Sequence, residues 1–179
     1  MRKKVLTISD SSTVRQACEF YFRTPKFLTL TGNTQKDYEA VLIHNCNTPI
    51  QNNKLFGGVK LKDVRFKYVT HLYDTWLNTR GVRRANYHAT CLSILFNTAI
   101  RHEAMISNPV SLIQRTKNTN RKVKWTEEQV KLFLDTSYSD FRWRSIGLIA
   151  HMAYDWAQRM GDMRLLQWSN IDFDAKRLD

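Results

Sequence analysis

The sequence has few of the residues that build cross-linked, metal-bound or membrane-spanning proteins. Its three cysteines are odd in number and include no Cys-x-x-Cys pair, which argues against a disulfide framework and a zinc site. No apolar run approaches the roughly 18–20 residues needed to span a bilayer, and no apolar segment of a signal peptide follows the basic N-terminus. The five histidines lack paired ligand spacing. We therefore expect a cytoplasmic protein with no metal, no cofactor and no membrane partner.

Acidic residues are scarce in the first two thirds of the chain. Residues 1–125 carry 21 basic side chains against 7 acidic ones, whereas residues 126–179 carry 7 against 9. Hydrophobic residues make up 42% of the whole and charged residues 25%, a globular composition. A basic excess confined to one section indicates a polyanionic partner, most simply nucleic acid.

The apolar spacing is helical, and no strand is indicated before Pro109. Val14, Ala17, Cys18 and Tyr21 share one helix face. The pattern predicts four main helices before Pro109: one capped by Thr13 and Gln16, one from Gly32 to about Asn45–Pro49, and two separated by a turn at Gly81.

A polar, basic stretch at residues 114–124 predicts a linker. Beyond it, Thr126 and Gln129 fit a capping box, and further helices are expected up to about Trp168, a residue expected to pack in a core. Residues 171–173 look like a strand without a partner, so the chain is expected to be a fragment. The expected organisation is a domain at 1–113, the linker at 114–124 and an incomplete domain at 125–179.

The order of these features resembles the phage-type tyrosine recombinases, or integrases. The segments that carry the resemblance are "NPV" at Asn108–Val110, the basic linker, "WTEEQVKLFL" at Trp125–Leu134 and "RMGDMRLLQWSNID" at Arg159–Asp172. The resemblance implies a mainly α chain: a SAM-like four-helix core-binding domain, then the first helices of an α+β catalytic domain. In two places the sequence departs from the family pattern, which has Thr-Gly where Trp156-Ala157 stand and more often glutamate where Asp162 stands.

The resemblance also implies the chemistry. Arg159 takes the place of the first catalytic arginine, and Asp162 would support it. In the family a tyrosine attacks a DNA phosphodiester and forms a 3′-phosphotyrosyl link, and no metal or ATP is needed. All seven tyrosines precede Arg159, so the nucleophile is not expected within this chain, which should bind DNA without cleaving it. The implied partner is a double-stranded DNA attachment site, bound by a homotetramer of the full-length protein, while the fragment is expected to be monomeric.

Candidate DNA-contacting residues are the basic and polar side chains near the predicted turns and in the linker. They are Lys60, Lys62, Arg65, Lys67, Arg80, Arg83, Arg84, Asn86, His88, Arg115, Lys117, Arg121, Lys122 and Lys124. Most such contacts go to phosphate, whereas Asn86 or an arginine is suited to a base edge. About half of this set is expected to be ordinary solvated charge.

Two other classes remain open at this point. Residues 79–96 can be read as a turn leading into a recognition helix, and residues 124–135 resemble the start of a Myb-like repeat, so a non-catalytic helical DNA-binding regulator is the alternative. A helical protein–protein adaptor is the second, although the basic excess argues against it. Without the family resemblance, Arg159 would be interpreted as a surface arginine paired with Asp162.

Overall fold

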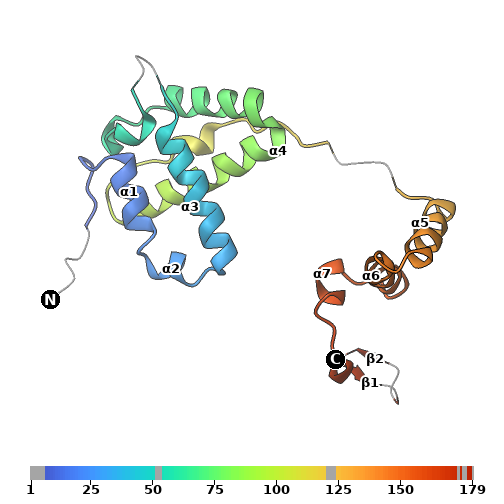
Figure 1. The fold of residues 1–179 in the computed structure, drawn as a ribbon. Helices are drawn as coiled ribbons and strands as arrows, with labels where there is room; N and C mark the ends of the chain where they lie inside the picture. Colours follow the sequence, from blue (N-terminus) through green and yellow to red (C-terminus); the bar gives the residue numbers. More distant parts are fainter. Residues whose placement is uncertain (1–6, 51–53, 120–123, 173, 175–176, 179) are drawn as a thin grey trace. The chain divides into compact units, whose positions relative to one another are not determined.

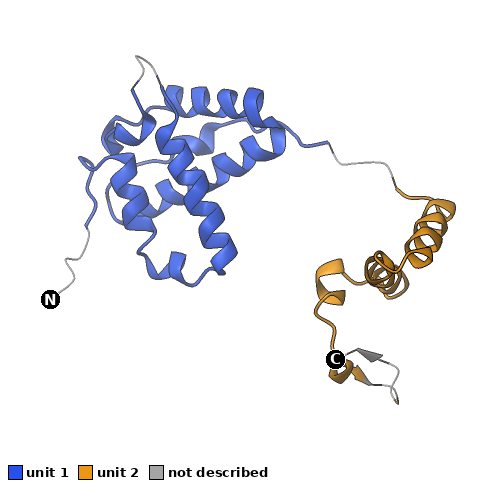
Figure 2. Cartoon of the chain, viewed as in Figure 1, with its two compact units in different colours: residues 1–119 blue, residues 120–179 orange. Residues whose placement is uncertain are grey.

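The computed structural model describes residues 7–50, 54–119, 124–172, 174 and 177–178. The chain divides into two compact units, residues 1–119 and residues 120–179, which are coloured separately in Figure 2. The division falls inside the stretch expected to be a linker.

The regular elements in the described part of unit 1 are all helices or 3₁₀ turns, joined by loops (Figure 1). Its elements are α1 (Val14–Tyr21), α2 (Pro25–Leu28), α3 (Gly32–Asn47), the short 3₁₀ turns η2 (Phe56–Gly58) and η3 (Leu61–Asp63), α4 (Phe66–Arg101) and η4 (Pro109–Leu112). The mainly α fold class expected from the sequence is confirmed.

The helix starts follow the local capping chemistry. Thr13 accepts a hydrogen bond from the Gln16 backbone N–H, and the Gln16 side chain accepts one from the Thr13 backbone N–H, so the predicted capping box at α1 is present. The same reciprocal pair forms between Thr126 and Gln129 at α5. These bonds satisfy backbone donors that the first turn of a helix leaves unpaired.

The core of unit 1 lies where α1, α3 and α4 meet. Trp76 of α4 is fully buried, and Tyr21 of α1 is nearly so. Cys18 of α1 and Cys46 of α3 lie with their Sγ atoms 3.6 Å apart, both buried, and Gly57 packs directly onto Cys46, where a Cβ would come within 2.8 Å of the Cys46 Cβ. All three cysteines are free and buried.

Helix α4 is broken at Gly81. This residue has φ +76° and ψ +168°, a combination open essentially only to glycine, and it separates a first arm before it from a second arm after it. Figure 1 shows the two arms running in different directions from this break. The predicted turn at Gly81 is therefore confirmed, and the second arm is the last of the four main helices expected before Pro109, whereas the short helix α2 was not expected.

Unit 2 contains α5 (Glu127–Ser139), α6 (Arg144–Asp155), α7 (Met160–Met163), the 3₁₀ turn η5 (Trp168–Asn170) and two short strands. The strand β1 (Ile171–Asp172) pairs antiparallel with β2 (Arg177–Leu178). The expectation that a strand near residue 171 would lack a partner is wrong, because the few residues that follow it suffice for a hairpin.

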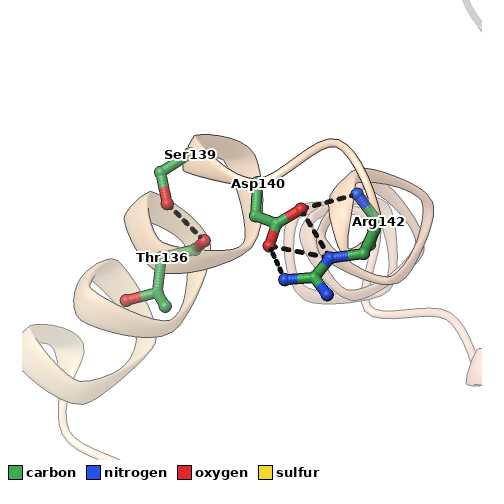
Figure 3. A network of polar contacts seen from close by, with 4 residues as sticks. All are labelled: Thr136, Ser139, Asp140 and Arg142. Atoms are coloured by element: carbon green, nitrogen blue, oxygen red, sulfur yellow. Dashed lines mark hydrogen bonds and ion pairs between the residues drawn. The ribbon is translucent and has the colours of Figure 1, made fainter.

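The turn between α5 and α6 is held by Asp140 and Arg142. The Arg142 backbone N–H and Nε donate to Asp140 Oδ1 over 2.9 and 3.2 Å, and Nη2 donates to Oδ2 over 2.7 Å (Figure 3). In the last turn of α5, Ser139 Oγ donates to the Thr136 carbonyl over 2.8 Å. The guanidinium of Arg142 lowers the pKa of Asp140, so the turn keeps its charge pair at neutral pH.

Unit 2 buries little apolar surface among its described residues. Met163 is its one buried hydrophobic side chain there, and Trp168 is 81% exposed. The expectation that Trp168 packs in a core is wrong for the unit as described, because η5 turns this indole outward.

Replacing Gly81 by alanine is expected to lower the free energy of unfolding of unit 1 by about 1–3 kcal/mol, because an L side chain is strained at this φ and ψ. The matched control is Gly32→Ala at the start of α3, where a Cβ meets nothing within 4 Å and φ is negative. Urea unfolding measures the free energy of unfolding of each variant, with hydrogen exchange of the α4 amides as the signal for unit 1. Equal unfolding midpoints for the two variants would contradict a strained break.

Candidate nucleic-acid interface and phosphate-binding arginine

The first set of candidate cations lies at the start of α4, and we call it the entry cluster: Lys60, Lys62, Arg65 and Lys67. All four side chains are exposed. Val59 just before them and Leu61 and Val64 between them are buried, so the alternation of apolar and basic residues turns the cations outward. The segment is fixed to the beginning of α1, since the Leu61 backbone N–H donates to the Ser12 carbonyl over 2.8 Å.

A hollow of about 460 Å³ lies beside the entry cluster. Lys54, Arg65 and Lys67 line it together with Asp63 and Tyr68. The Lys67 ammonium lies 5.3 Å from the centre of the Tyr68 ring. Sequence reasoning missed Lys54, because a single lysine beside Leu55 gives no periodic signal.

The second set, the kink cluster, comprises Arg80, Arg83 and Arg84 on either side of Gly81. Arg84 Nη1 lies 4.0 Å from Asp37 Oδ1, and Arg80 Nη2 lies 3.5 Å from His44 Nδ1. No ion pair of Arg83 is found among the described residues, and its side chain is exposed.

A groove of about 580 Å³ adjoins the kink cluster between α3 and the second arm. Its lining consists of Asp37, Arg83, Arg84, Asn86, Tyr87 and Thr90. Tyr87 donates to Asp37 Oδ2 over 2.6 Å, and burial followed by this carboxylate raises the pKa of the phenol far above its usual range. Asp37 is a second residue that sequence reasoning missed, since its partners lie about 50 positions away along the chain.

The two clusters lie at opposite ends of the first arm (Figure 1). With a rise of 1.5 Å per residue, the arm from Phe66 to Arg80 places them about 20 Å apart. Such a separation lets both clusters contact the phosphates of one duplex, which carries a charge about every 1.7 Å of its axis.

His88, predicted to contact DNA, is buried at 2% exposure, and this prediction is wrong. Its Nδ1–H donates to Asn45 Oδ1 over 2.6 Å, and its ring lies 5.0 Å from that of Trp76. Burial first, and then the positive charges of its neighbours, lower the pKa of His88 to about 4. The ring is therefore a neutral core residue that joins α3 to α4.

Asn86 is half-buried, and both ends of its amide are hydrogen-bonded. Tyr73 donates to its Oδ1 over 2.7 Å, and its Nδ2 donates to the Thr116 carbonyl over 2.9 Å. The direct base contact expected from the sequence would require these bonds to break, so contact with a base stays only a prediction.

The described linker cations are exposed: Arg115, Lys117 and Lys124. Arg115 Nη1 donates to Thr90 Oγ1 over 2.9 Å, so the first residues of the expected linker are packed on unit 1 and not free of it. Arg121 and Lys122 lie outside the described residues.

Arg159 is exposed and directly precedes α7. Its backbone is extended, with φ −74° and ψ 141°, and its carbonyl accepts the Asp162 backbone N–H over 3.0 Å. Arg159 is the N-cap residue of α7 and not part of the helix, so it does not share a helix face with Asp162. Among the described residues, no ion pair or side-chain hydrogen bond joins the two.

The turn before Arg159 has a left-handed residue. Ala157 has φ +51°, and it stands where the family pattern has glycine. The backbone therefore has the conformation that a glycine there would adopt readily, at a cost of about 1–2 kcal/mol for an L side chain. This geometry turns the chain from α6 so that Arg159 starts α7 at an exposed position.

The described part of the chain contains no cluster of three or more histidine, cysteine or acidic side chains able to hold a metal ion. Of the helices that the structure describes, none combines the length and apolarity of a membrane span.

Comparison with known proteins finds similarity to integrases. No family model matches the chain. The ICEBs1 integrase of Bacillus subtilis (strain 168) is 32% identical over 104 residues, which cover 57% of this chain and 27% of that protein. The chain thus spans about a quarter of the length of this curated relative.

Solved structures of lambda integrase share the fold. A dimer bound to a COC′ core site matches with a TM-score of 0.75 at 19% identity, over 91% of this chain and 44% of that one. A tetramer bound to a Holliday junction matches with a TM-score of 0.76 at 19% identity, over 92% and 46%. The resemblance to the phage-type tyrosine recombinases is thereby confirmed over part of the length of such proteins.

The low pKa of His88 predicts an acid-sensitive unit 1. In the unfolded chain His88 binds a proton as the pH falls below its ordinary pKa of 6.5. In the folded chain it binds that proton only near its lowered pKa of about 4. The free energy of unfolding therefore falls between those values, by at most about 3 kcal/mol. His88→Asn, whose amide can donate to Asn45 but does not titrate, is expected to lose this part of the pH dependence in urea unfolding. The same slope in both proteins would contradict a neutral, buried His88.

Proposed function

We propose that the chain is the DNA-binding part and the first catalytic segment of a site-specific DNA recombinase. The observation that supports this most strongly is the pair of exposed cation clusters on a helical unit whose fold matches integrases solved on DNA. When full length, such a protein would break and rejoin strands through a 3′-phosphotyrosyl intermediate. A cytoplasmic location, bacterial or host, follows from the same proposal.

DNA binding would rest on the entry cluster, the kink cluster and the linker cations. Lysine and arginine that neutralise phosphates release condensed counterions, so affinity for duplex depends steeply on salt. Because such contacts carry little sequence information, they would position unit 1 on an attachment site without by themselves selecting it.

Arg159 would bind the phosphate that is cleaved. Its guanidinium is permanently charged, planar and able to donate two parallel hydrogen bonds, which suits the non-bridging oxygens of a pentacoordinate phosphorus. Such a donor raises the rate because it stabilises negative charge that develops only in the transition state. Its exposed position before α7 leaves the guanidinium accessible to DNA. We propose that Asp162, three positions after Arg159, supports this arginine.

The proposed partner is a double-stranded attachment site. Lambda integrase forms a tetramer on a Holliday junction, and we infer that the full-length relative of this chain acts as a homotetramer on paired sites, whereas the chain itself is monomeric. No cofactor enters the proposed reaction, because the phosphotyrosyl link conserves the energy of the broken bond.

The alternative of a non-catalytic regulator is not favoured by the comparisons. A regulator would leave the arginine motif in unit 2 unexplained, and its proposed recognition helix corresponds to the second arm of α4. Within that arm Ala85, His88 and Ala89 are buried, so this face packs on the core and cannot enter a groove.

Binding of the chain to duplex DNA should weaken steeply with salt, because each neutralised phosphate contributes about −0.9 to the slope of log K against log salt. Exchanging Lys62 and Lys67 for glutamine should make this slope shallower by about 1–2 and weaken binding to all sequences alike. Fluorescence anisotropy at several salt concentrations measures both quantities.

The matched control for charge is Arg23→Gln with Lys26→Gln, two exposed cations at and before α2. In Figure 1, α2 lies across unit 1 from the first arm of α4. This pair should leave the salt slope within about 0.5 of the wild-type value, since its side chains would release no counterions on binding. The proposed DNA-binding surface would be contradicted if the Lys62/Lys67 and Arg23/Lys26 variants changed the salt slope equally. It would also be contradicted if binding of the wild-type chain did not depend on salt.

The chain alone should bind a nicked duplex without forming a covalent adduct, because all seven tyrosines precede Arg159 in the sequence. Denaturing electrophoresis of the protein with labelled, nicked duplex measures this. A labelled band that survives denaturation and disappears in a Tyr→Phe variant of this chain would show that the nucleophile is among these residues. The reading frame beyond Asp179 gives an independent test, with His-x-x-Arg and a later tyrosine as the expected finding.

A further inference from the structure

Three residues far apart in the sequence form a closed ring of hydrogen bonds. Tyr73 donates its hydroxyl proton to Asn86 Oδ1 over 2.7 Å, and Asn86 Nδ2 donates to the Thr116 carbonyl over 2.9 Å. The Thr116 backbone N–H donates in turn to the Tyr73 hydroxyl oxygen over 2.9 Å. Each group therefore donates once and accepts once, and the phenol that links them is 4% exposed.

The ring joins both arms of α4 to the start of the linker. Tyr73 belongs to the first arm and Asn86 to the second, with the break at Gly81 between them. A fourth bond, from Arg115 Nη1 to Thr90 Oγ1 over 2.9 Å, lies one helical turn further along the second arm. We call Tyr73, Asn86 and Thr116 the linker clamp.

The clamp shortens the free tether. From Thr116 to Trp125 nine residues remain, which span at most about 30 Å when fully extended. If the clamp and the Arg115–Thr90 bond both opened, the last residue packed on the core would be Ile113, and the twelve residues from there to Trp125 would span about 40 Å. Closing the clamp therefore restricts where Lys117 and the later linker cations can go.

The clamp also fixes where the linker leaves unit 1. Asn86 follows Arg83 by three positions, so the two lie about one helical turn apart. The linker thus departs beside the kink cluster, and Lys117 is the first cation after the clamp.

We propose that Tyr73 and Asn86 are positioning residues for DNA binding: they hold the start of the linker at the kink of α4, so that its cations meet phosphates next to those bound by the kink cluster. This inference rests on the proposed function. Asn86 then acts through the linker and not by touching a base.

The hydrogen bonds are tested without DNA by Tyr73→Phe in the whole chain, which removes the hydroxyl and keeps the ring. Tryptic cleavage after Arg115 should become at least about tenfold faster, and the Thr116 amide should exchange faster, since it loses its acceptor. The control is Tyr87→Phe in the same helix, which loses a phenol hydrogen bond to Asp37 and should leave the Arg115 cleavage rate unchanged. An unchanged rate in Tyr73→Phe would overturn the clamp.

The role in DNA binding is tested by a double-mutant cycle. Tyr73→Phe and Asn86→Ala should each weaken duplex binding by about three- to tenfold. Both effects should fall to less than about twofold when Lys117, Arg121, Lys122 and Lys124 are all glutamine, because the clamp then has no cations to position.

Three outcomes would overturn the positioning role. If the Asn86→Ala effect persists in the glutamine background, Asn86 contacts DNA directly. If neither variant changes affinity while Arg115 cleavage accelerates, the clamp exists but positions nothing. If the wild-type chain binds no duplex, the proposed function fails with it, whereas the cleavage rate still reports on the hydrogen bonds themselves.

Discussion

The backbone of Gly81 is the constraint on which unit 1 depends. A single residue with positive φ divides thirty-six residues of helix into two arms. The first arm separates the two cation clusters, and the second supplies His88 to the core and Asn86 to the linker. A continuous helix would extend about 54 Å from end to end and could not return its second half to α3.

Polar contacts then fix the two arms. His88 joins the second arm to Asn45 of α3 inside the core, and Tyr73 joins the first arm to the second through Asn86. Buried polar groups that are paired cost little, whereas losing one partner leaves the other unsatisfied in a region of low dielectric. The same residues that look like surface polar groups in the sequence therefore hold the break at a defined angle.

Local chemistry made much of the fold predictable. The capping boxes at Thr13 and Thr126, the helix from Gly32 and the turn at Gly81 depend on residues within a few positions of one another, and short-range patterns record them. The position of the His88 side chain depends on Asn45, 43 positions away, and that of the Asn86 side chain depends on Thr116, 30 positions away. Nothing in the spacing of a helix tells which polar residue meets a distant partner and which meets solvent.

The candidate site was predictable to different degrees in the two units. Alternation with buried apolar residues marks the entry cluster, so its exposure could be inferred locally. Arg159 was found only through the family pattern, and the extended backbone that separates it from Asp162 was not foreseen, because a four-residue helix gives almost no periodic signal.

Lysine acylation with and without duplex DNA tests the central claim most directly, since it reports which cations the duplex covers. Bound DNA should protect Lys60, Lys62, Lys67, Lys117 and Lys124, whereas Lys26 of α2 and Lys131 of α5 should react equally in both states. Protection of Lys26 with continued reactivity of Lys62 and Lys67 would place the DNA on another face and contradict the account.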